Sequence, residues 1–199
     1  PVFHVYGITV MTLLPIALGG TVVRIRPTPD ACLAAVERER VTRFAAVPAI
    51  FALLNRQRER GSYDLSSCKS WICGGAPLAE SVVDAFERGF GRHIHEGYGM
   101  LEASPGISWN LDDRPFRRGA VGRPLAGVEV AIRAADGSAV PRGEEGEIWV
   151  RSPGVMRGYY ADPAATADAL RDGWLDTGDL GCFDADGDPY LRGGKKEGM

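Results

Sequence analysis

In the first half of the chain, segments with helical apolar spacing alternate with short apolar runs. Helical patterns cover 7–18, 30–40, 48–60 and 79–90. Runs that suit strands cover 21–25, 44–47, 70–73 and 93–97. Since strands that alternate with helices favour parallel pairing, the pattern predicts an α/β fold with a helix-flanked, mostly parallel sheet.

After Gly119 the pattern changes to short alternating segments. The runs 128–132 and 147–150 suit strands, and Asp136-Gly137 between them is a hairpin-turn signal. Further short strands are expected around Trp174, Phe183 and Tyr190, with one helix over 163–170. We therefore predict a small antiparallel, β-barrel-like subdomain that follows the α/β layer.

The predicted organisation is an α/β subdomain over 1–117, a β-rich subdomain over 118–192 and a hinge over 193–199. The chain begins abruptly at Pro1 and stops at Met199 without a tapering tail, so we expect both ends to be incomplete.

Composition narrows the functional class. Hydrophobic residues make up 45% and charged residues 25% of the 199 residues, which is typical of a soluble globular protein. A net charge of −3 offers no basic footprint for nucleic acid or an anionic membrane. The four cysteines form no CxxC pair, which favours reduced, mostly buried thiols and a cytoplasmic location. The composition leaves the oligomeric state open.

No transmembrane segment is predicted. The longest apolar stretch, 8–18, is too short to span a bilayer and contains Pro15, so we expect a buried helix there.

The first candidate site follows the apolar strand 70–73. There Gly74, Gly75, Ala76 and Pro77 lead into a helix, and small residues at the carboxyl end of a parallel strand let a ligand approach the backbone. An ordinary strand-to-helix turn is the alternative. The chain contains neither GxGxxG nor GxxxxGK[ST], which disfavours dinucleotide and P-loop folds.

A second candidate site spans Glu96 to Glu102. Tyr98 lies between two glycines, so its ring can lie flat against a planar base, and the Glu102 carboxylate can hold a hard cation such as Mg²⁺ beside phosphates. A buried tyrosine next to a solvated glutamate is the alternative. The segment consists of Glu96, Gly97, Tyr98, Gly99, Met100, Leu101 and Glu102.

The third candidate is Asp179, in a turn-like segment from Trp174 to Gly181. A carboxylate there can accept hydrogen bonds from both vicinal hydroxyls of a ribose. A plain β-turn is the alternative, because Asp and Gly form turns in any case.

In this order, the three segments resemble the adenylate-forming (AMP-binding) enzymes, which include acyl-CoA synthetases, peptide-synthetase adenylation domains and luciferases. The segments 1–7, 146–151, 155–160 and 184–197 are also similar to motifs of that family. The resemblance covers essentially the whole chain, which would be a fragment of the family's large N-terminal domain.

The resemblance implies roles for the candidate residues. His4 and Glu102 would be catalytic, with Glu102 at Mg²⁺, while Tyr98 would stack on adenine and Asp179 would bind ribose. Lys196 would lie at the hinge of a C-terminal domain. The nucleotide-binding set would be Gly74, Gly75, Ala76, Pro77, Glu96, Gly97, Tyr98, Gly99, Met100, Leu101 and Asp179.

The implied activity is that of an acyl-CoA synthetase, which activates a carboxylic acid with ATP and transfers it to CoA. The segments Tyr98–Glu102 and Lys195–Glu197 favour this branch, with a fatty-acid-like substrate of open chain length. The alternatives are an amino-acid or acyl adenylation domain that loads a carrier protein, and a non-catalytic nucleotide- or acyl-binding module.

Two positions depart from the family pattern. Leu101 replaces a Thr or Ser that would contact phosphate, and Gly194 replaces an Arg that would reach the nucleotide. The resemblance implies a phosphate-binding loop ahead of Pro1 and a C-terminal domain with the catalytic lysine after Met199, and we expect both to lie outside this sequence. We therefore expect this chain alone to make no acyl-adenylate.

Overall fold

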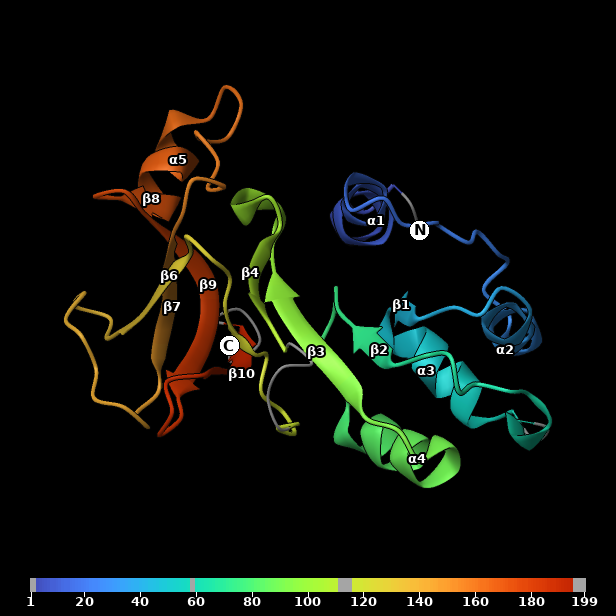
Figure 1. The fold of residues 1–199 in the computed structure, drawn as a ribbon. Helices are drawn as coiled ribbons and strands as arrows, with labels where there is room; N and C mark the ends of the chain where they lie inside the picture. The colour runs from blue at the N-terminus through green and yellow to red at the C-terminus, as the bar shows by residue number, and fades with distance from the viewer. Residues whose placement is uncertain (1–2, 58–59, 111–115, 195–199) are drawn as a thin grey trace. The chain divides into compact units, whose positions relative to one another are not determined.

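The computed structural model describes residues 3–57, 60–110 and 116–194. By its internal contacts the chain divides into two compact units, 1–96 and 97–199 (Figure 1). Strand β3 (Ile94–Gly99) begins in the first unit and ends in the second.

Parallel strands form the centre of the first unit. Strand β1 (Arg43–Ala46) pairs with β2 (Ser70–Cys73), which pairs in turn with the start of β3. The helices that accompany them are α2 (Pro29–Arg38), α3 (Pro48–Asn55) and α4 (Glu80–Phe90), with a short 3₁₀ turn, η2 (Arg60–Ser62), between α3 and β2. The predicted α/β layer with a parallel sheet is confirmed.

The ends of these helices follow from local chemistry. The Thr28 hydroxyl accepts a hydrogen bond from the amide of Ala31 and caps α2, whose first turn contains Asp30. Pro48 begins α3, where no amide donor is needed. Helix α3 ends at Asn55, five residues before the predicted end at Arg60.

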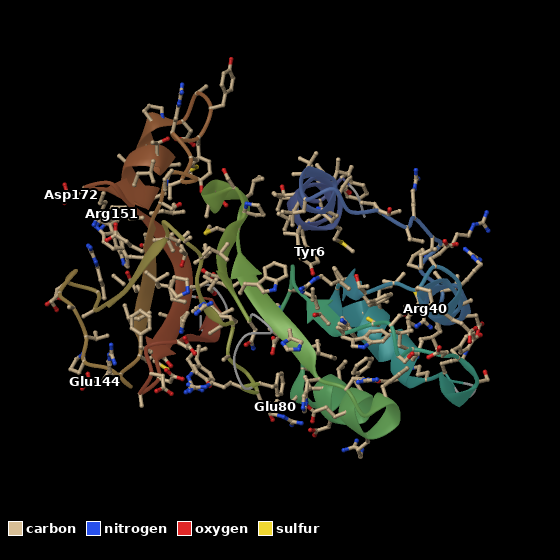
Figure 2. All side chains as sticks on the ribbon, viewed as in Figure 1. Tyr6, Arg40, Glu80, Glu144, Arg151 and Asp172 are labelled. Atoms are coloured by element: carbon tan, nitrogen blue, oxygen red, sulfur yellow. The ribbon has the colours of Figure 1, made fainter. Side chains whose placement is uncertain are left out.

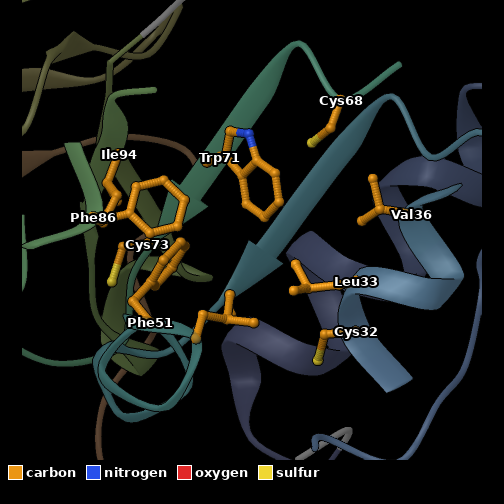
Figure 3. Close-up of a cluster of buried hydrophobic side chains, with 11 residues drawn as sticks. Cys32, Leu33, Val36, Phe51, Cys68, Trp71, Cys73, Phe86 and Ile94 are labelled. Atoms are coloured by element: carbon orange, nitrogen blue, oxygen red, sulfur yellow. The ribbon is translucent and has the colours of Figure 1, made fainter. Parts of the chain in front are cut away.

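The core of the first unit is aromatic (Figure 3). Trp71 and Phe51 each pack edge-on against Phe86 with ring centroids 5.3 Å apart. Cys32, Cys68 and Cys73 belong to the same core, and together with Cys182 they are buried and free, as predicted. This packing holds the carboxyl end of β2 and the first residue of β3.

Two predictions for the start of the chain are wrong. The segment 21–25 forms no strand, although its β-branched residues favour one, because it pairs with no strand in the described part of the chain. The segment 7–18 is helical, as a π-helix, η1 (Tyr6–Leu13), followed by α1 (Leu14–Ala17), but it is not buried. Its apolar side chains point in every direction, so that Leu13, Leu14, Ile16 and Leu18 remain exposed.

Antiparallel pairing dominates the second unit, as predicted. The end of β3 pairs with β4 (Gly106–Trp109), which pairs with β5 (Arg123–Pro124). A further sheet has the strand order β10-β9-β7-β6, with β8 paired to β9. The bounds are β6 (Glu129–Arg133), β7 (Gly146–Arg151), β8 (Leu170–Arg171), β9 (Trp174–Phe183), β10 (Pro189–Gly194), helix α5 (Pro163–Ala169) and the 3₁₀ turn η3 (Leu101–Ala103).

The two faces of this sheet differ in chemistry. Ile148, Val150 and Leu175 are fully buried and join the core of the second unit. On the other face the Arg133 guanidinium lies 4.9 Å from the ring centroid of Trp149 and 4.8 Å from that of Trp174. This alternation follows from the two-residue period of a strand.

Among the described helices, none has both the length and the apolar character needed to cross a membrane.

Candidate functional site

The turn after β2 brings together residues from two parts of the first unit. A Cβ atom on Gly74 would lie 3.1 Å from Cε2 of Tyr6, so the tyrosine ring rests directly on that glycine. Gly75 has a φ of +85° and lies beside His4, whose Cε1 is 3.7 Å from the position of a Cβ there. Gly75, Ala76 and Pro77 are exposed. His4 and the predicted glycine turn are therefore neighbours.

Tyr6, which contacts Gly74, is buried. Its ring is 7% exposed, and its hydroxyl has no hydrogen-bond partner among the described residues. Figure 2 labels this side chain, which extends from the η1 helix. Burial raises the pKa of the Tyr6 hydroxyl, so that it stays protonated. The Tyr6 amide donates to Nδ1 of His4 over 3.2 Å, which makes Nδ1 the unprotonated ring nitrogen.

Cys73 and Glu96 face each other across β2 and β3. Burial raises the pKa of the Cys73 thiol to about 12, and the nearby Glu96 adds to the rise. Burial also raises the pKa of the Glu96 carboxyl from 4.5 to about 7. Burial therefore keeps the Cys73 thiol protonated at neutral pH and favours the neutral form of the Glu96 carboxyl.

The second unit contains a paired tyrosine and carboxylate. The Tyr98 hydroxyl donates a hydrogen bond of 2.7 Å to Oδ2 of Asp179, 81 residues further along the chain. Tyr98 is 8% exposed, and burial together with the charge of Asp179 raises the pKa of its hydroxyl. Because Tyr98 stays protonated, it can act as a fixed donor to one oxygen of Asp179.

Asp179 lies on a bulge inside strand β9 and not on the isolated turn that the sequence suggested. The register between β7 and β9 shifts opposite this point, and Gly178 has a φ of +73°. The Thr177 hydroxyl donates to the carbonyl of Ile148 over 2.8 Å and accepts from the Asp179 amide over 3.2 Å. The bulge thus fixes the backbone that carries the carboxylate.

The glycines on either side of Tyr98 allow close packing. A Cβ on Gly99 would lie 2.0 Å from the carbonyl oxygen of Pro105, and one on Gly97 would lie 3.0 Å from the ring of Trp109. In the next residue, the Met100 amide donates to the Pro105 carbonyl over 2.9 Å. These glycines let the end of β3 and the following turn lie tightly against β4.

Glu102 lies on turn η3, directly after this strand. The Tyr159 hydroxyl donates to Oε1 of Glu102 over 3.0 Å, and the Met156 amide donates to the Glu102 carbonyl over 2.7 Å. Leu101, in the preceding position, is 69% exposed. The side chain at position 101 therefore faces solvent.

The residues around Glu102 fit a cation that arrives with a ligand. In the described ranges no group of three or more His, Cys, Asp or Glu side chains could hold a metal ion. Mg²⁺ needs only one or two carboxylates when phosphate oxygens and water complete its coordination. A single carboxylate of known orientation suits that mode of binding.

Gly194 is paired with Asp179 in the β9–β10 register. A Cβ at position 194 would lie 3.7 Å from Oδ1 of Asp179, in ordinary van der Waals contact. A side chain in this position would therefore border the carboxylate directly. Lys196, the predicted hinge residue, lies outside the described residues.

Of the predicted site residues, the structure groups His4 with Gly74 and Gly75 in the first unit, and Tyr98 with Asp179 in the second. Sequence reasoning missed two tyrosines, Tyr6 and Tyr159. The partner of Tyr159 is 57 residues away, and no local pattern in the sequence indicates that contact.

Comparison with known proteins identifies a family. The family model described as AMP-binding enzyme matches residues 1–160. A long-chain-fatty-acid–CoA ligase of Yersinia pestis is 37% identical over 194 residues, which are 96% of this chain and 34% of that protein. A feruloyl-CoA synthase of an Amycolatopsis species is 38% identical over 192 residues, which are 94% of this chain and 38% of that protein.

A solved structure is similar over nearly the same region. The amide bond synthetase McbA from Marinactinospora thermotolerans has a TM-score of 0.80 and 43% sequence identity, over 90% of this chain and 37% of that chain. The present chain thus spans about a third of the length of the relatives it matches. Its α/β fold is that of this family of enzymes.

Proposed function

The chain belongs to the family of AMP-binding enzymes, and from this premise we propose that it is part of an ATP-dependent acyl-CoA synthetase. The carboxylate of an acid substrate attacks the α-phosphate of ATP, which gives an acyl-adenylate and releases pyrophosphate. The thiol of CoA then attacks the acyl carbon, and AMP leaves. This chain supplies nucleotide- and acid-binding parts of that enzyme.

The observation that carries the proposal is the pairing of Tyr98 with Asp179. The tyrosine hydroxyl holds one carboxylate oxygen in place, and the bulge in β9 fixes the backbone beneath it. An ionised carboxylate held in this way is a strong acceptor for a vicinal diol such as that of ribose. We assign Asp179 to the ribose and the ring of Tyr98 to the adenine.

The remaining roles follow the same assignment. We assign the turn after β2, with Gly74, Gly75 and Ala76, to the nucleotide base, and His4 to the acid substrate. Lys196 belongs to the hinge. Glu102 would hold Mg²⁺, which supplies positive charge to the phosphates when bound. Since the first step needs little proton transfer, positioning and charge neutralisation carry most of the catalysis.

We propose a carboxylic acid of fatty-acid type as the substrate and CoA as the acceptor, supported by the similarity to the Yersinia ligase. The similarity to a feruloyl-CoA synthase makes an aromatic acid the competing substrate. An amine is the second possible acceptor of the acyl group, in place of CoA, because the chain is 43% identical to an amide bond synthetase. The third possible acceptor of the acyl group is a carrier-protein thiol, as in adenylation domains.

The first experiment is an exchange assay. The complete enzyme that contains this chain is incubated with ATP, Mg²⁺ and labelled pyrophosphate, together with single fatty, aromatic or amino acids. We expect label to enter ATP only when the correct acid is present. The variant Asp179→Asn should lower this exchange, while Asp168→Asn, on the exposed side of α5, should leave it unchanged.

The same assay separates the alternatives. Tight binding of AMP without exchange for any acid would contradict the enzyme and support a nucleotide-binding module. Where exchange occurs, adding CoA, an amine or a carrier protein identifies the acceptor by the product. Formation of an amide but no thioester would contradict the proposed CoA transfer.

A further inference from the structure

Turn η3, which carries Glu102, is held by the loop that follows β7. The Met156 amide donates to the Glu102 carbonyl over 2.7 Å. Gly154 lies so close to the turn that a Cβ on it would come within 2.9 Å of the Ala103 carbonyl oxygen. The Tyr159 hydroxyl donates to Oε1 of Glu102 over 3.0 Å. The loop therefore contacts both the backbone and the side chain of one residue.

Tyr159 is itself anchored. Its amide donates to the Thr166 hydroxyl over 2.9 Å, and that hydroxyl donates to the Asp162 carbonyl over 2.7 Å. A Cβ on Gly158 would lie 2.7 Å from the Thr166 side chain, so the loop packs directly on α5. Helix α5 thus fixes the backbone from which the Tyr159 hydroxyl reaches Glu102.

We propose that Tyr159 is a positioning residue for Glu102, which holds one carboxylate oxygen so that the other is presented to a divalent cation bound with a nucleoside triphosphate. The inference rests on the proposed function, in which Glu102 holds that cation. It adds a residue that does not touch the cation or the nucleotide but sets the orientation of the side chain that does.

A single glutamate needs such a partner. Its side chain has several rotatable bonds, and among the described residues it belongs to no group of three or more His, Cys, Asp or Glu side chains that could hold a metal ion. A hydrogen bond to Oε1 removes part of that rotational freedom before the cation arrives. Partners of this kind commonly change metal affinity by about tenfold or more when they are removed.

The neighbouring residue gives a matched control. Tyr160 is the same residue type, one position along the loop, and its side chain is fully exposed at 101%, while Tyr159 is 40% exposed and bonded to Glu102. Replacing each with phenylalanine removes one hydroxyl from the same loop. Only the Tyr159 hydroxyl is proposed to orient Glu102.

The test measures cation binding directly. The complete enzyme is saturated with a non-hydrolysable ATP analogue and titrated with Mn²⁺, and free Mn²⁺ is followed by electron paramagnetic resonance. We expect Tyr159→Phe to weaken Mn²⁺ binding about tenfold and Tyr160→Phe to leave it unchanged. Binding of the analogue in the presence of a chelator should be equal in both variants. Equal Mn²⁺ affinity in Tyr159→Phe and the unmodified enzyme would overturn the proposal.

Two further variants separate the possible failures. Glu102→Gln should abolish the Mn²⁺ site, and if it does not, both the assigned role of Glu102 and the positioning role of Tyr159 are wrong. If Glu102→Gln abolishes the Mn²⁺ site but Tyr159→Phe has no effect, only the positioning role of Tyr159 is wrong. Thr166→Val removes the acceptor for the Tyr159 amide, so it should weaken Mn²⁺ binding in the same direction by a smaller factor. It provides the test should Tyr159→Phe fold poorly, and an unchanged affinity there would then overturn the proposal.

Discussion

Two tyrosines, one in each unit, are buried to nearly the same extent but differ in what their hydroxyls contact. Tyr6, in the first unit, is 7% exposed and its hydroxyl has no partner among the described residues. Tyr98, in the second, is 8% exposed and donates to Asp179. The first unit therefore provides shape and a poorly hydrated surface, whereas the second provides an oriented charge.

The same contrast extends to the titratable groups. In the first unit burial raises the pKa of Cys73 and of Glu96, which favours their neutral forms. In the second, Glu102 and Asp179 each accept a hydrogen bond from a tyrosine hydroxyl. Neutral surfaces suit the acyl part of a substrate, and oriented carboxylates suit ribose and a cation.

The largest loss of stability is expected from replacing a closely packed glycine, and it should differ between the two units. In Gly99→Ala the new methyl group would meet the Pro105 backbone at 2.0 Å, and the backbone cannot move away without breaking β3–β4 pairing. In Gly74→Ala it would meet only the Tyr6 ring, at 3.1 Å. We expect losses of stability of about 3 kcal/mol and about 1 kcal/mol.

Hydrogen exchange of the amides in β3 and β2 of the complete enzyme measures these losses. Gly61→Ala is the control, because nothing lies within 4 Å of a Cβ there. A larger loss for Gly74→Ala than for Gly99→Ala would contradict this difference between the units, since it would mean that the first unit is the less adaptable one.

The two tyrosines should respond in opposite directions to loss of the hydroxyl. Tyr98→Phe removes one hydrogen-bond donor to Oδ2 of Asp179, which should cost about 1.5 kcal/mol of stability. Tyr6→Phe removes a buried hydroxyl that has no partner, so it should be neutral or stabilise the protein by up to about 1 kcal/mol. Thermal denaturation of the two variants beside the unmodified enzyme gives both values. Equal destabilisation by the two substitutions would contradict the distinction.

An effect of similar size is expected from the pH dependence of stability in the first unit. Because the pKa of Glu96 rises from 4.5 to about 7 on folding, the folded protein binds the extra proton between these values. The stability from this group is complete below pH 4.5 and is lost as the pH rises through 7. For a partly buried group we expect a loss of about 1 to 2 kcal/mol.

Urea denaturation between these pH values measures that loss. Glu96→Gln, which cannot ionise, should flatten the profile, whereas Glu80→Gln on the exposed start of α4 should keep it. A profile that is unchanged in Glu96→Gln would show that another group causes the dependence.

Local patterns predicted the regular elements of the first unit well. The strand 70–73 and the helix ending at Phe90 have the predicted bounds at those ends, because apolar spacing and flanking glycines determine them locally. The segment 21–25 has equal strand propensity but no strand beside it, and pairing partners are not encoded in a five-residue pattern.

The candidate site shows a similar division. Residue types and their order indicated Tyr98, Glu102 and Asp179, but not the hydrogen bonds that join Tyr98 to Asp179 and Tyr159 to Glu102. The Tyr98–Asp179 bond depends on the bulge in β9, which places Asp179 within an apparently regular strand, and the Tyr159–Glu102 bond depends on the loop after β7. Such contacts between distant segments appear only when the sheet is assembled.

The most direct test of Asp179 as the ribose-binding residue compares two nucleotides on two proteins. The affinities of the complete enzyme and of Asp179→Asn are measured by calorimetry for AMP and for its 2′,3′-dideoxy analogue. We predict that the unmodified enzyme prefers AMP by about 10- to 100-fold, as expected for hydrogen bonds to a charged acceptor, and that Asp179→Asn loses most of this preference. Equal affinity of the unmodified enzyme for both nucleotides would contradict the assignment of Asp179 to the ribose.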